Sequence, residues 1–351
     1  MRISAYILIP VSLLALVASA LNAQESGTSQ QSEMGQFLGA KETAHPAWFK
    51  ESFLDFEEDI AEATAQNKRL VLYFYQSGCP YCNKLVEENF ADPVIADKVQ
   101  TGFDLVAINM WGDREVVEVG GNVFTEKTLA AALNVNFTPT LLFFNEQKKV
   151  ALRIDGYYPS AKFIHALNYV AEKKENQSSF SEYLAGLQQG KANGKLNSAE
   201  WLLNAPYSLD QLESGKPVAV LFEEPECETC DLLHQKTFSN PAALPLLSQF
   251  DVVQLNRWSD TTVTRPDGTQ ISAKDWATEL DLGFSPAIVL FNADGEQIIV
   301  VDAMFKTFHI LGVFDYVASQ AYRSEPSFQR YLSARAEHIR STGKDVDIWS
   351  Y

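Results

Sequence analysis

Cysteine is scarce in this chain of 351 residues, which holds only four. All four fall in two Cys-x-x-Cys motifs, Cys79–Cys82 and Cys227–Cys230, so none is left over for a separate structural crosslink. None lies near the N-terminus, and a lipid anchor on an N-terminal cysteine is therefore not expected. In an oxidising compartment bare thiols would not last, so each motif is expected to form its own disulfide.

Positive charge is also in short supply. The chain has 28 Lys and Arg residues against 45 Asp and Glu, a formal net charge of -17. Such a surface repels polyanions, which argues against nucleic acid or an anionic membrane as a partner.

Histidine is rare as well, and only one of the five has spacing that suggests a ligand. His234 follows Cys230 by four positions, which on a helix would place sulfur and imidazole on one face. The first motif has Val86 at the corresponding position, so we expect a surface histidine and no metal site.

The longest apolar stretch lies at the N-terminus. Residues 1–23 carry one basic residue, Arg2, and then an apolar core that ends in small residues. This pattern is typical of a cleavable signal peptide, with cleavage after Ala20 or after Ala23. It predicts export to the periplasm without stable membrane insertion after cleavage. Residues 24–45 are rich in Gln, Ser, Gly and Glu and are predicted to form a disordered leader.

The first cysteine motif follows an apolar run, Leu70–Phe74, and a short turn. This order predicts a buried strand that leads to a helix beginning at the dithiol. At a helix N-terminus the unpaired N–H groups and the dipole favour a thiolate on Cys79, and Pro80 fits the first turn. Because Cys-x-x-Cys also forms half of many zinc sites, the motif alone leaves redox and metal roles open.

A second motif favours a redox role for the dithiol over a metal-binding role. Thr138-Pro139-Thr140 stands at the entrance of another apolar run, and Asp155-Gly156-Tyr157 follows it. With these motifs, the segment from Leu70 to Glu172 resembles the thioredoxin superfamily, and within it the periplasmic thioredoxins of the SoxW type. The resemblance implies that Cys79 attacks and Cys82 resolves. It also implies that Pro80, Tyr81 and a cis-proline loop at Thr138-Pro139 contact an extended substrate peptide.

One position departs from thioredoxin itself, which has a buried Asp six residues before its first cysteine. In this chain the residue six positions before Cys79 is Tyr73, and the residue six positions before Cys227 is Leu221. Thr138 before the proline is instead similar to the bacterial disulfide isomerases, so the direction of electron flow stays open.

The second half of the chain repeats the first at an offset that changes by a single residue. Cys227-Glu228-Thr229-Cys230 follows its own apolar run, and Phe284-Ser285-Pro286 corresponds to Phe137-Thr138-Pro139. The predicted fold class is α/β, with two tandem thioredoxin-like domains, each a central mixed β-sheet flanked by helices. By the same correspondence, Ser285 and Pro286 are candidate substrate-binding residues.

The predicted domains are residues 46–189 and 198–340, joined by a linker at 190–197. Strands are expected at 65–74, 104–110, 140–145 and 150–154, and again at 217–222, 251–255, 287–292 and 297–301. Residues 114–124 and 261–270 are expected to form loops near the active face, and Asp92 and Asn240 to cap helices that begin at a proline.

The resulting hypothesis is an exported thiol-disulfide oxidoreductase that acts on protein thiols and disulfides through Cys79 and Cys82. No bound cofactor is expected beyond the redox-active disulfides Cys79–Cys82 and Cys227–Cys230. A membrane electron donor of the disulfide-reductase type is a candidate partner. The second domain is either a relay or a degenerate partner, and acidic residues around Cys227 predict a less stable thiolate there. The alternative is a non-enzymatic peptide-binding module or chaperone with idle disulfides.

Overall fold

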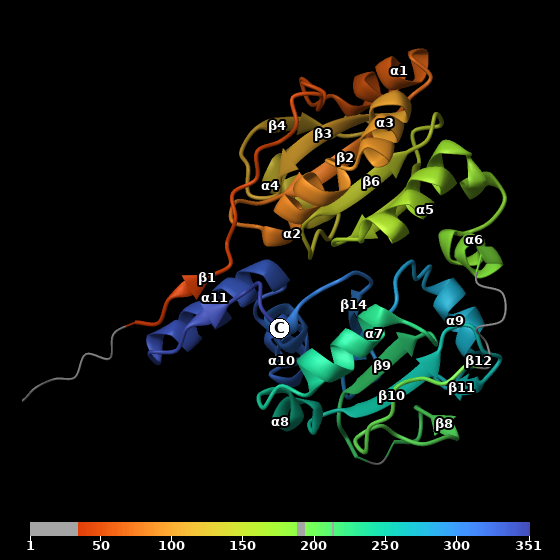
Figure 1. Cartoon of the computed structure of the whole chain (residues 1–351), viewed down its shortest axis with the longest axis vertical. Coiled ribbons are helices and arrows are strands. Elements are labelled where there is room, and N and C mark those ends of the chain that lie inside the picture. Colours follow the sequence, from red (N-terminus) through yellow and green to blue (C-terminus); the bar gives the residue numbers. More distant parts are fainter. Residues whose placement is uncertain (1–33, 188–193, 213) are drawn as a thin grey trace, which may run out of the picture. The chain divides into compact units, whose positions relative to one another are not determined.

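The strand that leads to the first dithiol lies inside a four-stranded mixed sheet in the computed structural model of the chain (Figure 1). The structure describes residues 34–187, 194–212 and 214–351. The sheet has the order β3-β2-β6-β7, in which β2 runs parallel to β3 and antiparallel to β6. Its strands are β2 (Arg69–Tyr75), β3 (Phe103–Asn109), β6 (Thr140–Phe144) and β7 (Val150–Asp155).

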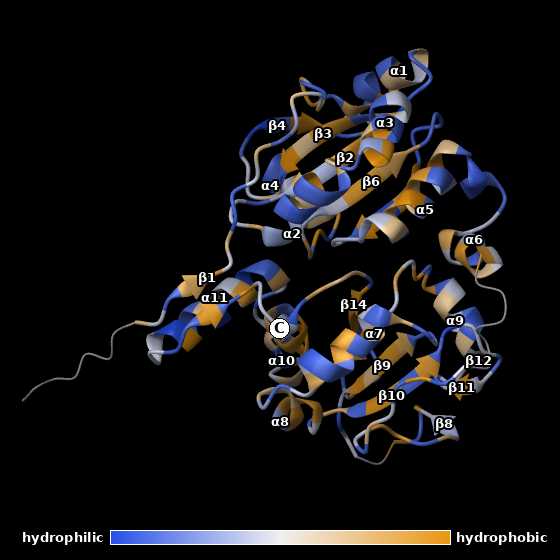
Figure 2. Ribbon diagram, in the orientation of Figure 1, coloured by the Kyte–Doolittle hydropathy of each residue, from blue (hydrophilic) through white to orange (hydrophobic). Residues whose placement is uncertain are grey.

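The apolar run of β2 is buried on both faces of this sheet. Val71 and Tyr73 point into one hydrophobic cluster, whereas Leu70, Leu72 and Phe74 point into the other. A strand covered on both faces needs no polar alternation, which explains the continuous run in the sequence. Figure 2 shows the hydrophobic residues concentrated in the central strands of each sheet.

Helices and a short hairpin surround this sheet. The helices are α1 (Phe56–Ala65), α2 (Pro80–Lys84), α3 (Pro93–Gly102), α4 (Glu126–Ala132), α5 (Ser160–Ala171) and α6 (Phe180–Leu187), with a π-helical turn, η1 (Leu85–Asn89), and a 3-10 turn, η2 (Lys174–Asn176). The hairpin consists of β4 (Glu115–Val117) and β5 (Val123–Thr125).

The second half of the chain has the same topology. Its sheet has the order β10-β9-β13-β14, with β9 parallel to β10 and antiparallel to β13. The strands are β9 (Val218–Glu223), β10 (Asp251–Asn256), β13 (Ala287–Phe291) and β14 (Gln297–Val301), beside a smaller sheet of β8 (Tyr207–Ser208), β11 (Thr262–Thr264) and β12 (Gln270–Ser272). The predicted fold class is therefore confirmed. We call the described residues up to Leu187 the first domain and those from 194 onward the second domain.

The helical elements of the second domain largely match those of the first. They are α7 (Glu228–Leu232), η4 (Leu233–Phe238), α8 (Ala243–Leu247), α9 (Ala273–Glu279), α10 (Thr307–Ala318), η5 (Ala321–Arg323) and α11 (Phe328–Ser341). None of the described helices has the length and apolar character that crossing a bilayer requires.

Several expected boundaries were wrong. The strand expected from residue 65 begins at Arg69, because Asp55 caps a helix that continues to Ala65. The two expected loops contain the hairpins β4–β5 and β11–β12. Asp92 caps α3 as predicted, but α8 begins at Ala243, and Asn240 instead accepts the N–H of Ala242 in a turn.

The end of the predicted leader is also ordered. β1 (Phe37–Leu38) pairs in parallel with β15 (Val346–Asp347), so backbone hydrogen bonds hold residues that were expected to be disordered. β15 lies beyond the predicted end of the second domain at residue 340. The predicted signal peptide, residues 24–33 of the leader and residues 190–193 of the linker lie outside the described residues.

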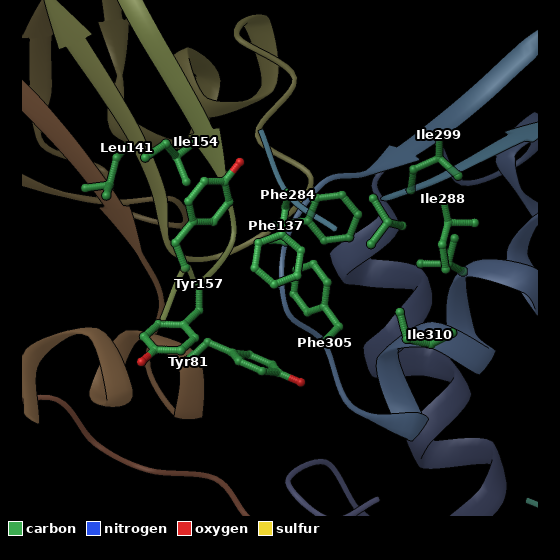
Figure 3. Packing of buried hydrophobic residues seen from close by; sticks show 14 of the residues in the cluster. Tyr81, Phe137, Leu141, Ile154, Tyr157, Phe284, Ile288, Ile299, Phe305 and Ile310 are labelled. Carbon is green, nitrogen blue, oxygen red and sulfur yellow. The ribbon is translucent and has the colours of Figure 1, made fainter. Parts of the chain in front are cut away.

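The two domains share one hydrophobic cluster within a single compact unit, Met34–Tyr351. Figure 3 shows Tyr81, Phe137 and Tyr157 of the first domain close to Phe284 and Phe305 of the second. A backbone hydrogen bond of 3.1 Å from Met304 N to the Tyr157 carbonyl joins the two chain segments. Gly283 permits this approach, since a Cβ there would lie 2.5 Å from the hydroxyl of Tyr158.

Candidate redox site

The first dithiol lies where β2 gives way to α2. Cys79 is the N-cap of α2, and its Sγ accepts the N–H of Cys82 at 3.0 Å. Pro80 occupies the first turn, as the sequence predicted. Cys79 and Cys82 form a disulfide, and both are buried, with Cys79 only 4% exposed.

The proline loop approaches the same sulfur from the opposite side. Thr138 donates its hydroxyl hydrogen to Cys79 Sγ at 3.3 Å, and its carbonyl oxygen lies 3.5 Å from that sulfur. The Thr138–Pro139 peptide bond is cis. A hydroxyl and a backbone N–H therefore both point at the sulfur, which is an arrangement that stabilises a thiolate in the reduced state.

Gln329, a residue of the second domain, also hydrogen-bonds to this part of the site. Gln76 donates from Nε2 to the Thr138 hydroxyl at 3.0 Å and to Oε1 of Gln329 at 2.8 Å. Gln329, in the first turn of α11, donates in turn to the carbonyl of Asn136 at 2.9 Å. Gln329 of the second domain thus hydrogen-bonds to the backbone of the first domain's proline loop.

Tyr81 is a second link between the dithiol and the second domain. Its side chain is 2% exposed, and its oxygen accepts the N–H of Lys306 at 2.9 Å. The hydroxyl also lies 3.3 Å from Nδ1 of His309. Burial lowers the pKa of His309 to about 3, so its neutral ring can accept the phenol hydrogen. Tyr81 was expected to contact substrate, but the structure places it inside the protein against Phe305 and His309.

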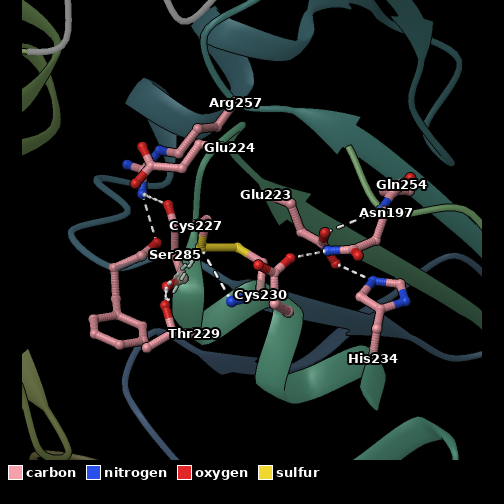
Figure 4. The surroundings of a disulfide bond; sticks show 12 residues. Asn197, Glu223, Glu224, Cys227, Thr229, Cys230, His234, Gln254, Arg257 and Ser285 are labelled. Atoms are coloured by element: carbon pink, nitrogen blue, oxygen red, sulfur yellow. Dashed lines mark hydrogen bonds and ion pairs between the residues drawn. A yellow bond between two sulfur atoms is a disulfide. The ribbon is translucent and has the colours of Figure 1, made fainter. Parts of the chain in front are cut away.

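The second dithiol has the same backbone arrangement with a different neighbour (Figure 4). Cys227 is the N-cap of α7, and its Sγ accepts the N–H of Cys230 at 3.1 Å in a Cys227–Cys230 disulfide. Thr229, at the position of Tyr81, donates to the carbonyl of Ser285 at 2.5 Å. The Ser285–Pro286 bond is also cis, and the loop carbonyl before Pro286 is occupied by a residue of the motif itself.

Two charged side chains, Arg257 and Asp302, form hydrogen bonds with the chain segment before Pro286. Arg257 donates from Nη1 to the carbonyl of Phe284 at 2.5 Å and to the Ser285 hydroxyl at 3.2 Å, and from Nη2 to the carbonyl of Leu282. Asp302 accepts the N–H groups of Gly283 and Phe284, each at 2.8 Å. Arg257 and Asp302 together therefore fix the path of the chain from Leu282 to Ser285.

Asp302 makes the stability of the protein depend on pH. Burial raises the pKa of its carboxyl group to about 6, above the ordinary value of about 3.9 that it recovers on unfolding. The folded state therefore binds this proton more tightly, and the contribution of Asp302 to the free energy of unfolding falls as pH rises from about 4 to about 6. Two pH units correspond to a loss of ~3 kcal/mol.

We expect the unfolding free energy of the wild type, relative to that of Asp302→Asn, to fall as pH rises over that range. Above pH 7 the difference between the two proteins should stay constant. Urea denaturation at a series of pH values measures it. Parallel curves for the two proteins would show that Asp302 does not titrate in this window.

Two of the acidic residues near Cys227 are withdrawn from solvent. Glu223 and Glu224 are buried and have polar partners. Glu223 accepts from Gln254 at 3.0 Å, and its Oε1 lies 2.8 Å from Nε2 of His234. The side chain of His234 is only 9% exposed, so the expectation of a surface histidine was wrong. Glu224 accepts the indole N–H of Trp258 at 2.6 Å. Among the described residues, no group of three His, Cys, Asp or Glu side chains has metal-binding geometry.

The sequence prediction missed the residues that the second domain places around the first dithiol and around its own loop. Gln329 lies in the first turn of α11, in a stretch of sequence without a recognisable functional motif. Arg257 is buried, but no spacing in the sequence distinguishes it from a surface arginine.

The fold and the paired dithiols define a tandem thioredoxin-fold protein, and comparison with known proteins agrees. The model of the thioredoxin-like domain family matches residues 56–171 and 210–317, well over half of the chain. The chain belongs to this thioredoxin-like family.

Among curated proteins, the chain is 25% identical over 162 residues to the thiol:disulfide interchange protein DsbD of Pseudoalteromonas atlantica. The match covers 45% of this chain and 25% of that relative, so the chain spans only about a quarter of the relative's length.

Two of the solved structures that are similar to this chain each match about a third of it. A thioredoxin-fold protein from Helicobacter pylori is 22% identical, with 34% of this chain and 80% of that chain covered and a TM-score of 0.31. The C-terminal domain of DsbD from Neisseria meningitidis in its oxidised form is 17% identical, with 33% and 96% covered and a TM-score of 0.25.

Proposed function

We propose that the protein is an exported, periplasmic thiol-disulfide oxidoreductase that exchanges disulfides through Cys79 and Cys82. The observation that carries this proposal is the position of Cys79 Sγ. This sulfur stands at a helix N-terminus, 3.0 Å from the N–H of Cys82 and 3.3 Å from the hydroxyl of Thr138. Hydrogen bonds and a helix dipole that favour negative charge lower a thiol pKa and so activate the attacking group.

The exchange proceeds in two balanced steps. The Cys79 thiolate attacks one sulfur of a substrate disulfide, the substrate S–S bond breaks, and the leaving thiolate takes up a proton. The Cys82 thiolate then attacks Cys79 in the mixed disulfide, releases the second substrate thiol and closes the Cys79–Cys82 disulfide. Two electrons pass from the protein to the substrate, and the same steps in reverse oxidise a substrate dithiol.

The second domain would serve as a relay or as a degenerate partner in this scheme. The bond from Thr229 to the Ser285 carbonyl supports the degenerate role, because it occupies an acceptor of the proline loop from within the chain. Protein thiols and disulfides are the proposed substrates, and a membrane electron donor of the disulfide-reductase type is a candidate source of electrons. The partial similarity to a thiol:disulfide interchange protein supports the same class of chemistry.

An assay of insulin reduction, together with oxidative refolding of a reduced test protein, examines the proposal. We expect the wild type to accelerate at least one of the two reactions and Cys79→Ser to fall to the rate without protein. Cys227→Ser is the matched control, since it removes the equivalent sulfur of the other motif, and it should retain activity if the second domain is degenerate. A wild type no faster than Cys79→Ser in both assays would refute the proposal.

The burial of both disulfides favours a second candidate function. Cys79 and Cys227 are only 4% and 7% exposed, as expected for idle disulfides in a peptide-binding module. In that case the wild type and Cys79→Ser would bind unfolded chains equally well and neither would catalyse exchange.

A further inference from the structure

Gln76, which directly follows β2, forms hydrogen bonds through both ends of its side-chain amide. Its Oε1 accepts the indole N–H of Trp111 at 2.8 Å. Its Nε2 donates to the hydroxyl of Thr138 at 3.0 Å and to Oε1 of Gln329 at 2.8 Å. Gln76 therefore connects a residue of the second domain to the hydroxyl group that lies beside Cys79.

Two neighbours fix which end of this amide faces Thr138. An indole N–H can only donate, so Trp111 must face the oxygen of Gln76. A backbone carbonyl can only accept, so the carbonyl of Asn136 takes the amide nitrogen of Gln329, at 2.9 Å, and leaves the oxygen of Gln329 toward Gln76. Both constraints require the amide nitrogen of Gln76 to be the atom that contacts Thr138.

This orientation decides where the hydrogen of the Thr138 hydroxyl points. The hydroxyl oxygen accepts from Gln76, which turns its single hydrogen toward Cys79 Sγ, 3.3 Å away. The carbonyl oxygen of Thr138 lies 3.5 Å from the same sulfur, and its partial negative charge opposes a thiolate. A hydroxyl group held as a donor offsets that opposition, and hydrogen bonds that follow one another in a chain strengthen each other.

The second dithiol has the same layout with different donors (Figure 4). Glu224 stands at the position of Gln76 and accepts the indole N–H of Trp258 at 2.6 Å, but a carboxylate has no amide hydrogen to pass on. The hydroxyl of Ser285 accepts instead from Nη1 of Arg257 at 3.2 Å. In each domain, therefore, a donor outside the proline loop holds the hydroxyl group that precedes the proline.

We propose that Gln76 is a positioning residue for the nucleophile Cys79 and that the second domain holds Gln76 in place through Gln329. This inference rests on the proposed function and deepens it, because the domain that carries the other dithiol would then help to activate the first. Gln76 acts through the hydroxyl of Thr138. Without Gln76 the hydroxyl can turn away from the sulfur, so a smaller fraction of Cys79 is thiolate at a given pH.

The test follows alkylation of the reduced full-length protein by iodoacetamide over a series of pH values. Tandem mass spectrometry of the peptide that contains both cysteines of the first motif measures the label on Cys79. Because the thiolate is the reactive form, the pH at which the rate reaches half its maximum reports the thiolate fraction. We call this pH the alkylation midpoint.

The other titratable groups beside Cys79 are the same in every variant. Those that line the adjoining cavity are Tyr81, His309, Glu337 and Arg340. Burial raises the pKa of Tyr81 and lowers that of His309 to about 3, so both are neutral near pH 7. Glu337 and Arg340 pair with each other at 3.0 Å. A difference in alkylation midpoint between the wild type and a variant therefore reports the hydrogen bonding of the sulfur.

We expect Gln76→Met, which keeps the length of the side chain, to raise the alkylation midpoint of Cys79 by roughly half a pH unit or more, about a threefold loss of thiolate below the midpoint. Trp111→Phe and Gln329→Met should each have a smaller effect, since the remaining neighbour still orients the amide. The two changes together should approach the effect of Gln76→Met. Ala334→Met, at an exposed position on α11, is the matched control and should leave the midpoint unchanged.

The Thr138→Val background distinguishes a positioning role from a general structural one. Gln76→Met should add no further shift to Thr138→Val, because Gln76 acts only through the missing hydroxyl group. Equal midpoints for the wild type and folded Gln76→Met would overturn the inference, and so would an additive shift in the Thr138→Val background. If circular dichroism shows that Gln76→Met does not fold, the combination of Trp111→Phe with Gln329→Met provides the same comparison.

The midpoint of the wild type tests the proposed function separately. A midpoint no lower than about 8.5, the ordinary value for a free thiol, would show that the sulfur of Cys79 is not activated and would remove the observation on which the proposed function depends. A low wild-type midpoint that Gln76→Met does not change would overturn only the role of Gln76.

Discussion

Tyr81→Ala is expected to lower the free energy of unfolding by about 3–5 kcal/mol, the usual effect of deleting a large buried aromatic side chain. The side chain packs edge-on against Phe305, His309 and Trp349 at ring-centroid distances of 5.1–5.2 Å. Its removal leaves a cavity and also takes the acceptor from the N–H of Lys306. Urea denaturation followed by tryptophan fluorescence measures the change.

A matched pair of milder substitutions isolates the hydroxyl group. Tyr81→Phe should cost about 1–3 kcal/mol, because a buried backbone N–H loses its partner. Tyr73→Phe should cost close to nothing, since the Tyr73 hydroxyl is equally buried and has no hydrogen-bond partner among the described residues. Equal losses from the two substitutions would contradict the role of the Tyr81 hydroxyl in joining the domains.

Arg257→Met is expected to lower the free energy of unfolding by about 2–6 kcal/mol, because two buried carbonyls each lose a donor at a cost of about 1–3 kcal/mol. Arg257 is 1% exposed, so methionine would replace much of its volume but none of its donors. The carbonyls of Leu282 and Phe284 would lose those hydrogen bonds, and Asp302 would lose the nearby positive charge.

Arg265→Met is the control for this prediction. Arg265 lies in the same domain and pairs with the exposed Glu279 at 2.7 Å, and surface pairs of this kind are worth about 0–1 kcal/mol. Combining Arg257→Met with Asp302→Asn should cost less than the sum of the two single changes, because the two groups act on one loop. A loss from Arg257→Met as small as that from Arg265→Met would mean that the loop from Leu282 to Ser285 does not depend on the hydrogen bonds of Arg257.

Much of the fold could be predicted because each element leaves a local pattern. The buried strand β2 appears as an unbroken apolar run, Cys79 and Pro80 mark the start of α2, and the repeated order of motifs identified the second domain. Asp92 was correctly predicted as an N-cap, since its carboxylate accepts the N–H groups of Val94 and Ile95. These features depend on contacts between residues close in sequence.

The errors have the opposite origin. β1 is too short and too polar in its surroundings to be recognised alone, and it is ordered only because β15, some 300 residues later, offers a backbone partner. Likewise Tyr81 stands beside the two cysteines in the sequence, where a substrate contact is the natural expectation. Its true partner, the N–H of Lys306, is more than 200 positions away.

The sequence by itself determined the dithiols, the helix that begins at each, the proline loops and the duplication, because backbone geometry and apolar periodicity act over short distances. Only the tertiary structure decided what surrounds these groups. It brought Gln329 and α11 over the first dithiol, occupied the Ser285 carbonyl with Thr229, and buried Arg257 and Asp302 around one loop. The physical reason is that hydrogen bonds and burial between distant segments depend on how the two domains pack, and no local pattern encodes that packing.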